Sequence, residues 1–124
     1  MKRLFQFLKS NHALTGILAL AWTVLIFIGC SMPGKELPKL TLFDQFDKVV
    51  HFSFFLVFYI LWNSWKEKPW LIILLAAIYG FAIEYYQLHC VAGRSFDVWD
   101  GVADTFGALC GFGLMMFWGK KTPV

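Results

Sequence analysis

Charge is the scarcest property of this 124-residue chain: 15% of its residues are Asp, Glu, Lys or Arg, and 59% are hydrophobic. A soluble domain of similar size is typically about half apolar and about a quarter charged. This chain has more apolar surface than a small soluble core could hide. The shortage of charge therefore disfavours a soluble domain and favours a small integral membrane domain.

Familiar catalytic and binding signatures are absent as well. The sequence contains no GxSxG, no HExxH and no P-loop, so no motif identifies a nucleophile, a zinc protease or a nucleotide site. Its 3 cysteines form neither a CxxC nor a Cys/His zinc spacing, and no cofactor is predicted. The net charge of +3 comes without a basic stripe, so no nucleic-acid partner is predicted.

What the sequence does contain is four long apolar runs. They cover about residues 13–30, 49–65, 70–88 and 96–118, and each has about the 17–25 residues that a helix needs to cross the hydrocarbon core. The segments between them are rich in Pro, Gly and charge. We therefore predict an all-α fold, an integral membrane four-helix bundle, with residues 1–124 as a single transmembrane domain.

Lysine and arginine predict the orientation of these spans. If successive spans alternate in direction, one side of the membrane holds four of the 11 basic residues and the other holds seven. The richer side comprises Lys2, Arg3, Lys9, Lys66, Lys68, Lys120 and Lys121. This bias predicts that both termini are cytoplasmic, and Trp and Tyr residues near both expected interfaces fit the same arrangement.

The first apolar run also resembles a lipoprotein signal, because basic residues precede it and it ends in FIGC. Cleavage there would leave Cys30 as a lipidated N-terminus. The length of the run and the bulky Phe27 favour a membrane anchor instead. We predict that Cys30, Cys90 and Cys110 are buried free thiols, although oxidation of Cys30 and Cys90 near the outer face stays an alternative.

Acidic residues gather toward the expected outer side. At about 100° per residue, Asp97, Asp100, Asp104, Gly107 and Gly111 share one stripe about 80° wide on the last run. The small residues of this GxxxG arrangement let another helix approach closely in lipid, so the stripe is predicted to face protein. A charge at the depth of Asp104 costs at least about 2.5 kcal/mol on insertion scales, which is why it should have partners.

The third apolar run carries a matching stripe. Its small residues, Ala77 and Gly80, are followed on the same face by Glu84 and Gln87 near the outer end. The two stripes are predicted to face each other. That arrangement would pack the GxxxG glycines of the last run against Gly80 and Ala77.

The outer ends of the last three runs together supply nine polar residues. These are Asp47, Lys48, His51, Glu84, Gln87, Arg94, Asp97, Asp100 and Asp104. Ionisable groups within a membrane are candidates for function, so we expect this set to line an outward-facing polar pocket. Arg94, Lys48 and His51 are the cations expected to pair with its acids.

Three blocks, in order, resemble the VanZ family of small bacterial membrane proteins: DKVVHF at 47–52, EYYQ at 84–87 and GRSFDVWDGVADTFGALCG at 93–111. The family shares Asp-Lys-x-x-His, then Glu-x-x-Gln, then Arg-x-x-Asp-x-x-Asp with a following Asn and Gly. The match covers most of the chain from Asp47 to Gly113. Asp104 stands where Asn is usual, which leaves open whether this position acts as a neutral hydrogen-bonding group.

The resemblance implies four transmembrane helices in a bacterial plasma membrane and a link to low-level resistance to teicoplanin, a glycopeptide acting on the outer face. It carries the same nine residues over as the site. Expected partners are membrane lipids and an envelope precursor or glycopeptide, with a homo-oligomer left open.

Three functional classes stay open. The first is a binder of a polar or cationic ligand at the outer leaflet. The second is an enzyme acting on a lipid or cell-wall precursor, with His51 and a carboxylate as acid and base, or with two or more acids holding a divalent cation. The third is a proton or ion pathway, which ranks last because the inner halves of the spans lack polar groups.

Overall fold

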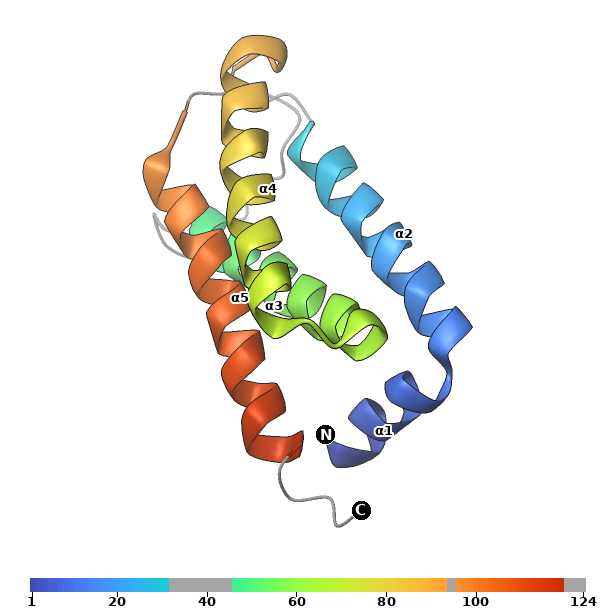
Figure 1. The fold of residues 1–124 in the computed structure, drawn as a ribbon. Helices are drawn as coiled ribbons and strands as arrows, with labels where there is room; N and C mark the ends of the chain where they lie inside the picture. The colour runs from blue at the N-terminus through green and yellow to red at the C-terminus, as the bar shows by residue number, and fades with distance from the viewer. Residues whose placement is uncertain (32–45, 94–95, 120–124) are drawn as a thin grey trace.

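The computed structural model describes residues 1–31, 46–93 and 96–119, and these residues form five helices and no strand. The predicted all-α fold is confirmed for this part of the chain. In order, the helices are α1 (Lys2–Ser10), α2 (His12–Cys30), α3 (Phe46–Lys66), α4 (Pro69–Cys90) and α5 (Val98–Gly119) (Figure 1).

The number of membrane-spanning helices is smaller than predicted when it is judged by length and hydropathy. Among the described helices, α2, α4 and α5 are long and apolar enough to cross a membrane. The 21-residue helix α3 is not one of them, because residues such as Lys48, His51 and Asn63 lower its hydropathy. A four-span bundle therefore does not follow from length and composition.

Helix α3 occupies the centre of the fold. It contacts each of the other four helices and runs behind α4 and α5 in Figure 1. Its Phe55 and Tyr59 are fully buried, and the ring of Phe58 stacks on Tyr79 of α4 with centroids 5.9 Å apart. Polar residues on a helix in this position meet protein on most sides, which explains how α3 can be less apolar than its neighbours.

Helix α2 is fastened to this core by polar bonds as well as by packing. The indole Nε1 of Trp22 donates to the Phe54 carbonyl at 2.9 Å, and Nε1 of Trp62 donates to Thr23 Oγ1 at 2.9 Å. The Tyr79 hydroxyl donates to the Thr23 carbonyl at 2.7 Å. Buried Trp and Tyr side chains need such partners, so these bonds fix the register of α2 against α3 and α4.

The short helix α1 is an unpredicted element. Phe5 and Leu8 are buried, three residues apart on one face, whereas Leu4 and Phe7 are half exposed. The helical conformation is interrupted between α1 and α2 at Asn11. The side-chain Nδ2 of Asn11 donates to the Phe7 carbonyl at 2.9 Å. The helix therefore lies against the bundle with an amphipathic character that a search for long apolar runs does not detect.

The outward faces of the three apolar helices are left uncovered. Within the most apolar window of each helix, 28% of α2, 33% of α4 and 28% of α5 is buried in protein. Ile17, Ile78 and Phe106 are among the large side chains that are more than half exposed. Such extensive apolar exposure suits a lipid environment and would be unfavourable in water.

The GxxxG glycines of α5 pack against a different helix from the one predicted. A Cβ on Gly107 would lie 2.3 Å from the carbonyl oxygen of Phe52, and one on Gly111 would lie 3.1 Å from the carbonyl oxygen of Leu56. Both carbonyls belong to α3. The predicted contact with α4 is wrong, because a stripe of small residues identifies a face and does not identify the neighbour.

Helix α4 approaches α5 nearer to the start of α5. A Cβ on Gly80 would lie 2.6 Å from Asp104 Oδ2, and Gly101 of α5 approaches the ring of Phe81 in a similar way. The buried alanine of this α4 face is Ala76, whereas Ala77 is only partly buried. The predicted α4 stripe is therefore displaced by one residue at its N-terminal end.

The cysteines differ in environment. All three are free, and Cys30 is buried, Cys110 is partly buried and Cys90 is exposed. The prediction of a buried thiol is therefore wrong for Cys90, which is the last residue of α4.

Candidate functional site

The first turns of α3 and α5 and the last turns of α4 bring a set of charged side chains together. The structure describes seven of the nine predicted residues: Lys48, His51, Glu84, Gln87, Asp97, Asp100 and Asp104. The side chain of Asp47 and the whole of Arg94 lie outside the described residues. We call His51, Glu84, Asp100 and Asp104 the buried cluster, since each is at most 6% exposed.

His51 and Asp104 form the innermost pair of the buried cluster. Nδ1 of His51 lies 2.9 Å from Asp104 Oδ1. When Asp104 is ionised it accepts a hydrogen bond from Nδ1, and Nε2 of a neutral ring then carries the lone pair. That Nε2 lies 3.9 Å from Oδ2 of Asp100.

Glu84 enters the same space from α4 and is fully buried. Its Oε2 accepts a hydrogen bond from the backbone N–H of Asp97 at 3.1 Å, which ties α4 to the start of α5. Its Oε1 has no hydrogen-bond partner among the described residues, and the same holds for Oδ2 of Asp104. An unsatisfied buried polar atom costs about 1–3 kcal/mol, and more when the group is charged.

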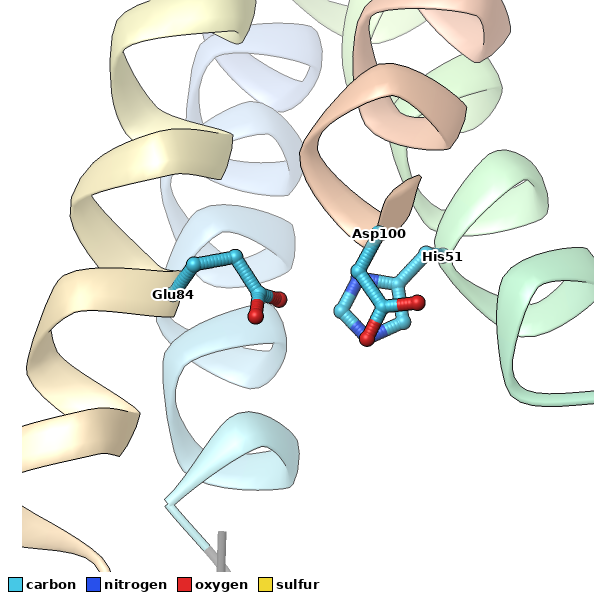
Figure 2. Close-up of side chains that lie close together, drawn as sticks. All are labelled: His51, Glu84 and Asp100. Atoms are coloured by element: carbon cyan, nitrogen blue, oxygen red, sulfur yellow. The ribbon is translucent and has the colours of Figure 1, made fainter. Parts of the chain in front are cut away.

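Figure 2 shows the convergence of three side chains from three helices. His51 from α3, Glu84 from α4 and Asp100 from α5 point toward one another. Each offers one potential metal-binding atom, and these atoms all lie within 4.8 Å of one another. Among the described residues, this is the group of His, Cys, Asp and Glu side chains that could hold a metal ion.

Lys48 connects the buried cluster to the surface. Its Nζ donates to Asp97 Oδ2 at 2.9 Å and to Asp100 Oδ1 at 3.1 Å. The Asp97 side chain is 35% exposed, whereas that of Asp100 is 8% exposed. The Lys48 ammonium thus bridges a partly exposed carboxylate, that of Asp97, and a buried carboxylate, that of Asp100.

The Lys48 ammonium beside Asp97 lowers the pKa of that carboxyl below its ordinary value of 3.8. A carboxyl with a lowered pKa in the folded state stabilises the fold above its ordinary pKa, and this contribution disappears as the pH falls through the lower folded value. We expect wild type to unfold at a higher temperature than Asp97→Asn at pH 7, with the gap closing below about pH 3.8.

Thermal unfolding of the detergent-solubilised chain between pH 7 and pH 3 measures this gap. Glu67→Gln is the control, since it removes an acid that is mostly exposed and paired with Lys9. A gap of constant size at every pH would contradict a stabilising Lys48–Asp97 pair.

Gln87 does not join the buried cluster. Its Nε2 donates to the carbonyl of Cys30 at 2.9 Å, and its side chain is 1% exposed. Gln87 therefore links α4 to the last turn of α2 and has a structural role in this arrangement.

A groove of about 540 Å³ lies over the first half of α5 beside Lys48. It is lined by Lys48, Asp97, Trp99, Val102, Ala103 and Phe106. Two of the nine predicted residues thus line it, whereas the buried cluster does not. Lys48 lines the groove and also contacts Asp100 of the buried cluster, so it connects the two.

The apolar wall of the groove was missed by the sequence reasoning. Trp99, Val102, Ala103 and Phe106 follow the spacing of one helix face, three and four residues apart. Such a face in a membrane helix is indistinguishable from ordinary lipid-facing surface. Its proximity to Lys48 is what gives it significance, and that proximity arises from the packing of α5 on α3.

The family comparison concerns this same region of the chain. A family model described as VanZ/LLP1 matches residues 14–119, which include α3, α4, α5 and nearly all of α2. The chain belongs to the VanZ/LLP1 family. The predicted resemblance is thereby confirmed, and together with the three apolar helices it identifies a membrane protein of the VanZ/LLP1 family. No curated protein and no solved structure matches the chain.

Proposed function

We propose that this VanZ/LLP1 protein binds a phosphate-bearing amphiphile at the outer face of the bacterial plasma membrane. The ligand class is a membrane lipid or a lipid-linked envelope precursor. One observation carries the proposal: the groove on α5 has a charged end, Lys48 and Asp97, followed by an apolar wall.

The groove suits the two parts of such a ligand. Val102, Ala103 and Phe106 offer an apolar surface to a hydrocarbon chain, and Trp99, which is 67% exposed, is a residue type enriched at the membrane interface. The Lys48 ammonium is a point charge of the kind that binds phosphate, and here it is shared with the carboxylates of Asp97 and Asp100. Asp97 favours a head group that also carries a hydroxyl or an ammonium. A volume of about 540 Å³ lies within the usual range of ligand sites.

The proposed topology has four spans, α2 to α5, with both termini in the cytoplasm. The N-terminus and the end of α5 lie at the same end of the molecule in Figure 1, as an even number of crossings requires. Lys2, Arg3 and Lys9 lie on α1 at that end, and basic residues favour the cytoplasmic side. The groove and the buried cluster then belong to the outer side. A reporter fused after Val124 should be active only in the cytoplasm.

Blocking the groove should abolish ligand binding. Ala103→Trp places an indole within the apolar wall, whereas Leu109→Trp adds the same side chain at an exposed position of α5 outside the groove. Native mass spectrometry of the detergent-solubilised chain would measure retention of added phosphatidylglycerol and of a polyprenyl phosphate. We expect at least tenfold weaker retention for Ala103→Trp and wild-type retention for Leu109→Trp.

The probe that the wild-type chain retains more strongly indicates the ligand: phosphatidylglycerol would indicate a bulk lipid, and the polyprenyl phosphate would indicate a lipid-linked precursor. Equal retention of both probes by Ala103→Trp and wild type would refute the groove as a binding site. The proposed link to glycopeptides has its own readout: expression in a teicoplanin-susceptible bacterium. The wild-type chain should raise the inhibitory concentration, and Ala103→Trp should not do so at equal membrane levels.

An enzyme acting on the same ligand is the second candidate, since the Asp104 pair leaves Nε2 of His51 as a base. His51 and Glu84 do not line the groove, however, so a ligand there would lie beyond Lys48 and Asp100. Binding therefore accounts for the arrangement better than catalysis. An ion pathway has less support, because the buried side chains of α3 between His51 and Ser64 are Phe55, Phe58, Tyr59 and Ile60, all without a charge.

A further inference from the structure

The buried cluster has the composition and placement of a metal centre. His51, Glu84 and Asp100 come from three different helices, and their potential ligand atoms lie within 4.8 Å of one another (Figure 2). Four ligands around Zn²⁺ at about 2.0–2.2 Å are about 3.4 Å apart. Side-chain movements of roughly 1 Å would bring the three atoms to that spacing.

A second observation is independent of this clustering. Glu84 is fully buried, and its Oε1 has no hydrogen-bond partner in the described part of the chain. Figure 2 shows that its carboxylate points toward Asp100 and His51. A buried, unsatisfied carboxylate oxygen calls for a partner, and a cation held by His51 and Asp100 would lie where that oxygen points.

The residues around the three ligands orient them as a metal requires. Asp104 holds Nδ1 of His51 at 2.9 Å, which keeps the lone pair on Nε2, the arrangement of the carboxylate–histidine–metal triad. Lys48 binds Oδ1 of Asp100, while Oδ2 lies on the side of His51. The backbone N–H of Asp97 donates to Oε2 of Glu84, which orients the carboxylate and leaves Oε1 for a metal ion.

The charge of the described cluster favours a divalent cation. Three buried carboxylates, those of Glu84, Asp100 and Asp104, lie near one ammonium, that of Lys48, and one imidazole. An excess of buried negative charge is unfavourable, and a doubly charged ion offsets it.

We infer that His51, Glu84 and Asp100 bind a Zn²⁺ ion and that Asp104 is a positioning residue for His51. An imidazole together with two carboxylates suits Zn²⁺, whereas Ca²⁺ takes six to eight oxygen ligands and Mg²⁺ prefers octahedral oxygen coordination. The inference does not rest on the groove ligand, because none of the three ligands lines the groove.

Metal uptake by the full chain tests the inference. Purified protein in detergent would be stripped with EDTA, dialysed against Zn²⁺ at pH 7.5 and analysed by plasma mass spectrometry and thermal unfolding. We expect one Zn²⁺ per chain and a higher unfolding temperature after reloading. His51→Ala and Glu84→Gln should bind at least tenfold more weakly. His89→Ala and Glu67→Gln, which change an exposed histidine and an exposed acid, should bind like wild type.

Asp104→Asn separates positioning from ligation. Asn keeps an oxygen that accepts the His51 Nδ1–H but has no charge, so affinity should fall by about 10–100-fold without disappearing. Three results would each overturn the inference: stripped wild type that takes up no Zn²⁺ and unfolds at an unchanged temperature, Glu84→Gln that binds like wild type, or preferential uptake of Mg²⁺. If the ligand variants do not fold, stripped and reloaded wild type compared with Asp104→Asn decides the matter.

Discussion

Gly107→Ala is expected to prevent most of the protein from reaching its folded state. The added Cβ would lie 2.3 Å from the Phe52 carbonyl oxygen and 3.2 Å from the Leu56 nitrogen, both backbone atoms of α3. Rotation of a side chain cannot relieve this clash, so α3 and α5 would have to separate along their interface. We expect a loss of about 3 kcal/mol, the upper part of the range for overpacked cores.

Gly113→Ala is the matched control on the same helix. No atom lies within 4 Å of a Cβ at this position, and Ala is favoured over Gly in a helix by about 1 kcal/mol. Fluorescence-detected size-exclusion chromatography and thermal unfolding in detergent would compare the two variants. Folded yields that do not differ between them would mean that α3 and α5 are not packed backbone to backbone at Gly107.

Lys48→Met should have the second-largest effect. The substitution keeps most of the side-chain volume but removes the ammonium from Oδ1 of buried Asp100 and from Asp97. Removing one partner of a fully buried ion pair costs about 3–5 kcal/mol. The Lys48 side chain is 23% exposed, so we expect about 2–3 kcal/mol here, measured as a lower unfolding temperature.

Two further variants test whether charge is the cause. Lys48→Arg keeps the charge and should retain most of the stability. Lys48→Met combined with Asp100→Asn should recover part of the loss, because the neutral amide no longer requires a counter-charge. A double variant less stable than Lys48→Met alone would show that Asp100 stabilises the fold through contacts other than the Lys48 ammonium.

The helices could be predicted because their signal is local. Each of the four apolar runs corresponds to one helix, α2 to α5, whose ends differ from the predicted ends by a few residues. Helix α1 was missed because its nine residues form an amphipathic pattern and not a long apolar run. The polar residues could be placed at one end of the bundle because lipid makes isolated charges unfavourable.

The packing partners of the helices could not be predicted, because the signal that determines them is not local in the sequence. A stripe about 80° wide on α5 is broad enough to meet two neighbours, and the structure divides it between them. Gly107 and Gly111 meet α3, whereas Asp104 meets both His51 of α3 and Gly80 of α4. That division decides which polar side chains are enclosed and which border a groove. Asp100 is buried, for example, whereas Asp97 lines the groove.

The central position of α3 has a consequence for how the protein enters its membrane. A translocon samples each segment as it emerges, and histidine, lysine and asparagine all make release into lipid less favourable. In the proposed four-span arrangement, α3 alone would present His51 to hydrocarbon until α5 supplies Asp104. We therefore expect α3 to be retained at the translocon and to be released into the membrane together with α4 and α5, which are synthesised after it. Ribosomes stalled before α5 should hold α3 in a state that a membrane-impermeant reagent can still reach.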